Sequence, residues 1–249
     1  MFLAFTGALA IGLSLGLMGS GGSILTVPIL VYLVGQDEKI AIAGSLFIVG
    51  CIAAVGGLQS AVQKNVHWHS VLWFGLPGMV GAWLGAQLSI FVSGRVQLLL
   101  FVFVMLAAGV FMLRPTQFKP DTHQRTVWKV ALDGLLVGML TGLVGVGGGF
   151  LIVPALVLLG GLPMHLAIGS SLIIIALKSF SGFAKYLEVL SHHEQTLDWT
   201  ILGTFVGLGI VGTVFGGVIA SRLPQNFLQK MFAGLLFLMS AAMLGAMVL

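Results

Sequence analysis

Apolar stretches separated by short polar breaks occupy nearly the whole chain. A helix needs about 20 residues to cross the hydrocarbon core of a bilayer, so the stretches at 22–34 and 148–161 are too short to cross alone. The pattern predicts an all-α integral membrane protein in which these two stretches are half-helices or re-entrant pieces near the midplane. The apolar stretches are residues 2–18, 22–34, 40–62, 70–91, 95–113, 128–145, 148–161, 164–186, 199–220 and 224–247.

Composition agrees with a location in the lipid bilayer. Of 249 residues, 58% are hydrophobic and 7% are charged, against about 25% charged in an ordinary soluble domain. The net charge of +4 is spread along the chain without a basic, aromatic-rich patch, so we expect no nucleic-acid partner. Cys51 is the only cysteine, which excludes an intrachain disulfide, and no zinc-type spacing of histidines occurs. We therefore expect no metal and no cofactor.

The sequence contains two copies of one unit. "GLMGSGGSILTVP" ends at Pro28 and "GLVGVGGGFLIVP" ends at Pro154, an offset of 126 residues, and "AIAGSL" falls on "AIGSSL" at the same offset. The second copy then gains five residues, after which Trp68 matches Trp199 at an offset of 131. The chain therefore divides into a first membrane repeat (1–114), a polar linker (115–126) and a second membrane repeat (127–249).

The charge distribution favours an inverted arrangement of the repeats. With five stretches in each copy, all changing sides, the copies point in opposite directions, a recurrent design among transporters. The positive-inside rule then puts the Lys/Arg-rich face in the cytoplasm and both termini outside. In the alternative, the first two stretches of each copy form one broken crossing and the copies are parallel. The richer face collects Lys64, Arg114, Lys119, Arg125, Lys129, Arg222 and Lys230, and the other collects Lys39, Arg95 and Lys185.

The glycine clusters are the first candidate binding site. Non-helical backbone at membrane depth must be buried in protein or line a polar cavity. If the half-helices begin near Ser23 and Gly149, their free N–H groups and positive dipole ends would face an anion that glycine allows to approach. Alternatively, these glycines only pack helices, which is our expectation for the GxxxG pairs beginning at Gly12, Gly81, Gly138 and Gly212. The predicted lining residues are Gly19, Ser20, Gly21, Gly22, Ser23, Gly145, Gly147, Gly148 and Gly149.

Four polar residues inside apolar stretches are further candidates. Lys178 lies too deep for comfortable snorkelling, and an intramembrane lysine is either functional or tied to backbone carbonyls or to a partner at the membrane edge. Ser45, Ser170 and Ser171 could donate hydrogen bonds to substrate oxygens or bond within and between helices.

The duplicated motifs carry a family resemblance. "GLMGSGGSILTVP" and "GLVGVGGGFLIVP", followed by "AIAGSL" and "AIGSSL", resemble the TauE/SafE family of membrane permeases over nearly the whole chain. The resemblance implies a polytopic carrier associated with sulfite, sulfoacetate, thiosulfate and related organosulfur anions. The motif does not fix the substrate of an individual member.

Together these features predict a secondary transporter that moves a small anion, sulfite or another sulfur oxyanion or organosulfonate, across the cell (inner) membrane by alternating access. The expected partners are this anion and the lipid bilayer, and the sequence leaves homo-oligomerisation open. ATP hydrolysis is not expected, because no P-loop motif occurs. Two alternatives stay open. An anion channel would conduct without counterflow, and a membrane-embedded enzyme would need clustered intramembrane His, Asp or Glu.

Overall fold

The computed structural model describes residues 2–113, 127–144, 149–192 and 197–248. They form helices joined by short connections, and seven of these helices are long and apolar enough to cross a membrane. The prediction of an all-α membrane protein is thereby confirmed. In chain order the elements are α1 (Phe2–Met18), α2 (Gly21–Pro28), η1 (Ile29–Leu33), α3 (Glu38–Val62), α4 (Trp68–Ser70), η2 (Val71–Gly75), α5 (Leu76–Leu88), η3 (Ser89–Phe91), α6 (Gly94–Leu113), α7 (Val127–Val144), α8 (Gly149–Pro154), η4 (Ala155–Leu159), α9 (Met164–His192), α10 (Trp199–Ala220) and α11 (Gln225–Val248).

The two short stretches form helices interrupted by a proline. α2 ends at Pro28 and α8 ends at Pro154, and each continues as a π-helical turn. Proline has no N–H to donate to the carbonyl four residues earlier, so the hydrogen-bond ladder is broken at that point. The five-residue spacing that follows is seen in bonds from Val34 N to the Ile29 oxygen and from Gly160 N to the Ala155 oxygen, each 3.0 Å.

Other local features recur at the same offset of 126 residues. Gly35 and Gly161, which follow the π-helical turns, both have positive φ, at 78° and 63°. The Ser45 Oγ donates to the Ile42 oxygen at 2.8 Å, and the Ser171 Oγ donates to the Ile168 oxygen at 2.8 Å. At these positions the two halves therefore share local backbone features.

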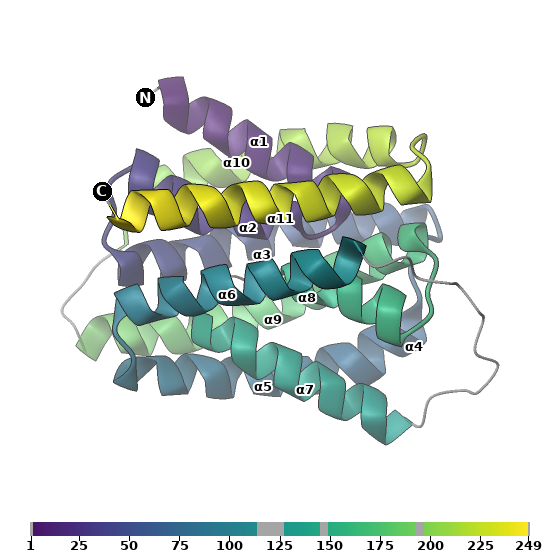
Figure 1. Cartoon of the computed structure of the whole chain (residues 1–249), viewed down its shortest axis with the longest axis horizontal. Coiled ribbons are helices and arrows are strands. Elements are labelled where there is room, and N and C mark those ends of the chain that lie inside the picture. The colour runs from purple at the N-terminus through teal and green to yellow at the C-terminus, as the bar shows by residue number, and fades with distance from the viewer. Residues whose placement is uncertain (1, 114–126, 145–148, 193–196, 249) are drawn as a thin grey trace.

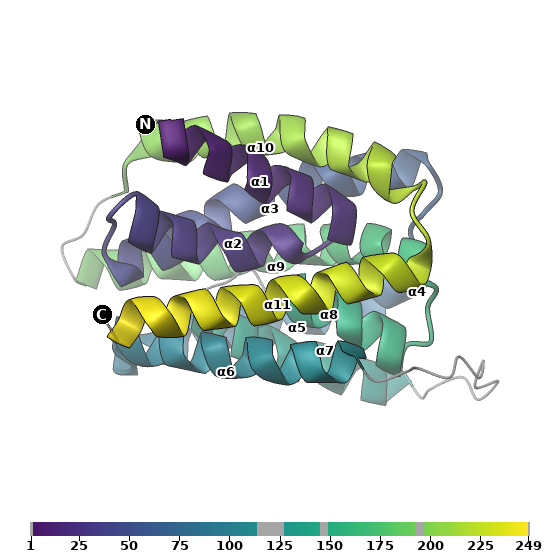
Figure 2. The same cartoon turned by 45° about the horizontal axis from the view of Figure 1, so that its top comes forward.

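Helices from the two predicted repeats pack against each other in pairs. α1 lies beside α10, α5 beside α7, α3 beside α9, and α6 beside α11. Each pair joins one helix that precedes the linker with one that follows it, so the two halves interlock rather than forming separate bodies. Both views show the two termini at one end of the bundle, and the end of α6 and the start of α7 at the other (Figures 1 and 2).

Glycines allow two of these pairs to approach closely. A Cβ added to Gly12 or Gly16 of α1 would fall on backbone carbonyls of α10, and one added to Gly81 or Gly85 of α5 would fall on carbonyls of α7. From the opposite side, an added Cβ on Gly138, Gly142, Gly212 or Gly216 meets the partner backbone in the same way. The predicted packing role of the GxxxG pairs is confirmed.

The outside of the bundle is apolar. Phe103, Phe215 and Leu238 expose 70%, 63% and 66% of their surface. Large apolar side chains this exposed are unfavourable in water, and in hydrocarbon they carry no such penalty. Together with the seven candidate spans, this surface indicates a multi-pass membrane protein.

Candidate functional site

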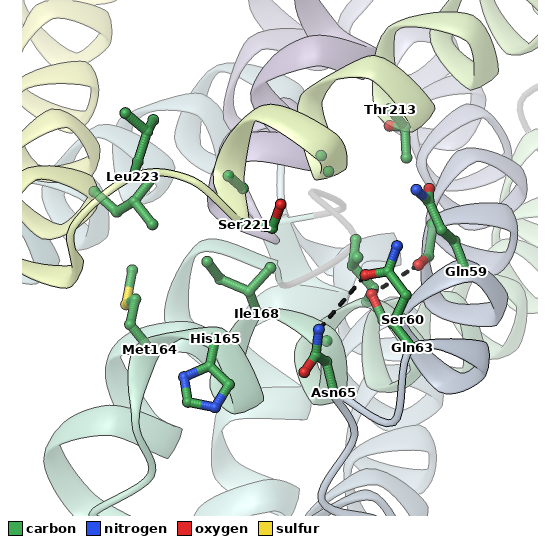
Figure 3. Close-up of a pocket in the computed structure, with 17 residues that line it drawn as sticks. Gln59, Ser60, Gln63, Asn65, Met164, His165, Ile168, Thr213, Ser221 and Leu223 are labelled. Atoms are coloured by element: carbon green, nitrogen blue, oxygen red, sulfur yellow. Dashed lines mark hydrogen bonds between the residues drawn. The ribbon is translucent and has the colours of Figure 1, made fainter.

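A polar pocket opens between the two halves, at the end of the bundle opposite the chain termini. Its volume is about 240 Å³, and it lies between the C-terminal end of α3, the N-terminal end of α9 and the C-terminal ends of α1 and α10. Figure 3 shows the amides from the end of α3 and the following loop on one side, with α9 and α10 forming the others. The polar residues around it include Gln59, Gln63, Asn65, His165, Thr213 and Ser221.

The end of α3 supplies most of the hydrogen-bonding groups. Gln59 and Gln63 are four residues apart, so they lie on one face of the helix. Ser60 satisfies its hydroxyl by donating to the Gly56 oxygen at 2.9 Å. The Asn65 Nδ2 lies 3.5 Å from the Gln63 Oε1, which is too long for a strong hydrogen bond. The side-chain amides therefore present donors and acceptors to the pocket.

The inner wall of the pocket meets one of the predicted glycine turns. Gly16 and Ile168 line this wall, and a Cβ on Gly19 would lie 2.8 Å from the Ile168 Cα and 2.8 Å from the Ser171 Oγ. Gly19 has φ of +70°, which a side chain would strain. The Ser171 Oγ also donates to the Gly19 oxygen at 3.1 Å. The predicted candidates Gly19 and Ser171 are thus brought together across the two halves.

Ser20, next to Gly19, has a hydroxyl without a described partner. Its side chain is completely buried, and its Oγ makes no hydrogen bond within the described residues. An unsatisfied buried hydroxyl costs about 1–3 kcal/mol. Ser20 is therefore a predicted site residue with unused hydrogen-bonding capacity.

Gly21, Gly22 and Ser23 lie within helix α2, which begins two residues earlier than the predicted start at Ser23. A Cβ on Gly22 would fall on the Ile11 carbonyl of α1, and one on Gly21 would overlap the Ser14 hydroxyl. Both glycines thus allow α2 to fold back closely against α1. The Ser23 Oγ donates to the Ser20 oxygen at 2.7 Å. The loop between α1 and α2 is consequently shorter than expected.

The remaining serines make hydrogen bonds within the protein. The Ser170 Oγ accepts from the His67 N at 2.8 Å and so anchors the loop after α3 to α9. Ser45 is buried and bonds within α3, as described above. In the second copy, Gly149 is the first residue of α8, as predicted. Gly145, Gly147 and Gly148 lie outside the described residues.

Lys178 is buried at the middle of α9, away from the pocket lining. Its Nζ has no hydrogen-bond partner among the described side chains and backbone, and it lies 5.0 Å from the centroid of the Phe74 ring. A cation–π contact contributes about 0.5–2 kcal/mol, less than the cost of taking an ammonium group out of water. The described structure contains no hydrogen bond from the Lys178 Nζ to a backbone carbonyl, so it does not support the alternative in which carbonyls hold this lysine.

A second pocket of about 410 Å³ lies between α4, η2, α7 and η4. Its lining includes His67, His69, Asp133 and Phe74, and the ring of this Phe74 is the one that Lys178 contacts. Burial and, secondarily, the nearby His69 lower the pKa of His67. The His67 Nδ1 accepts from the Ser70 N at 3.3 Å and caps α4.

The chemistry of the first pocket is hydrogen bonding without fixed charge. Among the residues that the structure describes, no Lys, Arg, Asp or Glu lines this pocket, and no three potential metal ligands form a cluster. Amide, hydroxyl and imidazole donors suit a small, oxygen-rich ligand. Sequence analysis missed Gln59, Gln63 and Asn65; their only signal was a group of polar residues at the end of an apolar stretch.

The chain is similar to probable membrane transporters along nearly its whole length. Residues 3–243 match the family model described as "Sulfite exporter TauE/SafE". A "Probable membrane transporter protein" of Xylella fastidiosa is 37% identical over 230 residues, covering 89% of this chain and 86% of the relative. "Probable membrane transporter protein YunE" of Bacillus subtilis is 28% identical over 258 residues, covering 92% and 91%. No solved structure matches the chain significantly.

Proposed function

Because the chain belongs to the TauE/SafE family of membrane transporters, we propose that it is a secondary transporter of a small anion across the cell (inner) membrane. The substrate class is sulfite or another sulfur oxyanion or organosulfonate, moved by alternating access. The observation that carries the proposal is the polar, uncharged pocket enclosed between the two halves.

The pocket's size and chemistry support a small oxyanion. Drug-sized ligands occupy sites of about 300–1,000 Å³, and this pocket is smaller, at about 240 Å³. Hydrogen bonds to an ionised acceptor are roughly twice as strong as those between neutral groups. The Gln59, Gln63 and Asn65 amides therefore hold an oxyanion firmly without a counter-charge, and such neutral binding keeps release possible.

The Gly19–Ser20 turn extends this site toward the membrane interior. Gly19 contacts Ile168 of the inner wall, and the Ser20 hydroxyl has hydrogen-bonding capacity to spare. We infer that an anion advancing from the pocket meets this turn and the N–H groups that begin α2. Ser171 positions the turn from the opposite half.

We also propose that the two halves are inverted repeats with both termini outside. The support is the recurrence of backbone features at an offset of 126 residues, the pairing of helices across the halves, and the grouping of both termini at one end. The end of α3, the start of α7, the end of α10 and the start of α11 lie at the pocket's end of the bundle. These helix ends carry or adjoin Lys64, Lys129, Arg222 and Lys230. By the positive-inside rule, the pocket then opens to the cytoplasm.

Anion-dependent thermal stabilisation of the purified protein tests the function. A ligand that binds only the folded state raises the free energy of unfolding, and this increase grows with the ratio of ligand concentration to Kd. We expect sulfite or a related sulfur oxyanion to raise the Tm. Gln59→Leu and Gln63→Leu should each weaken binding about tenfold or more, because each removes a hydrogen bond to a charged ligand.

Thr204→Val on α10 is the matched control and should bind normally, because Thr204 is partly exposed and lies outside the pocket lining. Two results would contradict the proposal. In the first, no anion of a panel containing sulfite, thiosulfate, sulfoacetate and small carboxylates stabilises the protein. In the second, both glutamine variants respond like the control.

A further inference from the structure

The open pocket has a counterpart at the opposite end of the molecule. The offsets of 126 and 131 residues assign to each residue of the pocket an equivalent in the other half. Ser60 at the end of α3 corresponds to Tyr186 near the end of α9, and Leu228 of α11 corresponds to Gln97 of α6. Ser60 and Leu228 border open space. Their equivalents are in contact with each other.

Tyr186 and Gln97 close this second region with a buried hydrogen-bond network. The Gln97 Nε2 donates to the Tyr186 Oη at 2.8 Å and also to the Leu143 carbonyl. The Tyr186 Oη donates to the same carbonyl at 3.1 Å. Both side chains are completely buried. Two polar side chains with no access to solvent thus join α6, α7 and α9 where the other half has a cavity.

Lys39 seals the adjoining corner. Its Nζ donates to the Ser89 oxygen at 2.6 Å and to the Val92 oxygen at 2.8 Å, tying the start of α3 to the corner between α5 and α6. The residue equivalent to Lys39 is His165. In the open half, His165 and the corner after α10 both line the pocket. Hydrogen bonds therefore hold the Lys39 corner together, whereas the equivalent corner at His165 borders the open pocket.

We propose that Tyr186, Gln97, Ser89 and Lys39 line a second substrate vestibule, which is closed in this structure and opens toward the end bearing the termini when the first pocket closes. Two similar halves that adopt different conformations can exchange them, which gives two states of the whole molecule. When the vestibule opens and these hydrogen bonds break, the Lys39 ammonium, the Tyr186 hydroxyl and the Gln97 amide can all donate to a small oxyanion. The exchange between the two mouths, which are the open pocket and this second vestibule, rests on the proposed alternating access, and the identity of the ligand rests on the proposed substrate.

A matched pair of cysteines reports on the two mouths. Gly217 lines the open pocket, and the atoms nearest to a Cβ added there belong to the Gln59 side chain, the first at 3.5 Å. Its equivalent at the 131-residue offset is Ala86, which is completely buried. In a Cys51→Ser background, Gly217→Cys and Ala86→Cys each provide the single thiol of the protein. The probe is the anionic reagent (2-sulfonatoethyl) methanethiosulfonate, applied to purified protein.

In the otherwise unaltered protein, the thiol at position 217 should react readily and the thiol at position 86 slowly. Tyr186→Phe removes the hydroxyl from the network without changing the ring. Losing one such hydrogen bond shifts a two-state equilibrium by about three- to tenfold. We expect the reaction at position 86 to accelerate by this factor, and the fraction of protein protected at position 217 to rise with it.

Gln97→Leu removes both amide bonds and should act in the same direction, so it answers the question if Tyr186→Phe does not fold. Unchanged labelling at position 86 in the folded variants would overturn the inference. Faster labelling at position 86 without protection at position 217 would also overturn it, because it indicates local loosening rather than exchange. Reciprocal labelling in a protein that binds no sulfur anion would uphold the two mouths and reject the proposed substrate.

Discussion

At the scale of single residues, Lys178 and Ile52 occupy equivalent places in the two halves but bring different chemistry to them. The Ile52 side chain fills the space beside Gly209 of α10, and the Lys178 stem fills the space beside Gly78 of α5. These are equivalent positions at offsets of 126 and 131 residues. An apolar side chain therefore fits this slot, and the amine of Lys178 is an addition that packing does not require.

Lys178→Ile should consequently stabilise the fold while it weakens transport. Removing a buried amine without a hydrogen-bond partner should raise the free energy of unfolding by about 1–3 kcal/mol. If Lys178 lies on the path that the anion takes through the protein, transport should fall because a positive charge on that path is lost. Thermal unfolding and uptake into proteoliposomes measure the two effects, with Lys129→Met at an exposed lysine as the control. Full transport by the stabilised variant would show that the Lys178 amine has no role in transport.

His67 should make stability depend on pH. Its pKa is lowered in the folded protein by burial and by His69, whereas the unfolded chain binds a proton at about 6.5. The unfolded state thus binds more protons as the pH falls through this value, so stability is lost on acidification and is unaffected above it. His67→Asn keeps a capping acceptor for α4 and should lose less Tm between pH 7.5 and 5.5. An equal loss in both proteins would exclude His67 as the source.

The sequence predicted some of the polar residues that matter in the structure and missed others. Gly19 and Ser171 were identified because they lie in repeated motifs, and the structure brings them into contact. Gln59 and Tyr186 were missed, because the significance of each depends on what faces it. The walls opposite Gln59 come from α9 and α10, and the partner of Tyr186 is Gln97 of α6. Neither relation is encoded in local sequence.

At the scale of elements, glycine contacts determine how closely the helices pair. In α1–α10 and α5–α7 the backbones meet without intervening side chains. Contacts of this kind hold membrane helices together where no hydrophobic effect operates between them. The spacing of the glycines predicted their role, but the partner helix is a property of the tertiary fold. The apolar stretches locate the ends of the helices to within two residues, except that α9 continues six residues past the predicted end at 186. The predicted start of α2 is two residues late, because Gly21 and Gly22 belong to the helix and not to a loop.

Two valine substitutions in α10 separate packing from intrinsic helix effects. A Cβ on Gly212 would lie 2.6 Å from the Leu9 oxygen of α1, whereas one on Gly207 would meet nothing within 4 Å. Gly212→Val should therefore destabilise the protein by about 2–4 kcal/mol, typical of overpacking against backbone. Gly207→Val should change stability by less than about 0.5 kcal/mol. Tm and monodispersity on size-exclusion chromatography measure the difference, and equal behaviour of the two variants would refute the close α1–α10 contact.

At the scale of the whole molecule, the account depends on how the two halves are oriented. Both termini lie at one end and the linker-side ends of α6 and α7 at the other. Reporter fusions at the C-terminus and within the linker near Lys119, which lies outside the described residues, should report opposite sides of the membrane. The linker should be cytoplasmic, because the Lys/Arg-rich face is there. A cytoplasmic C-terminus would contradict this orientation and favour the parallel arrangement.

The central claim is that a small sulfur oxyanion binds between the halves and is carried by alternating access, and counterflow tests it most directly. Proteoliposomes are loaded with unlabelled sulfite and diluted into a trace of radiolabelled sulfite. A carrier whose site faces one side at a time exchanges internal for external substrate, so label should accumulate transiently above its external concentration. Gln59→Leu should slow this accumulation, and Thr204→Val should leave it unchanged. Absence of accumulation for every sulfur oxyanion tested, or equilibration without overshoot as through a channel, would contradict the account.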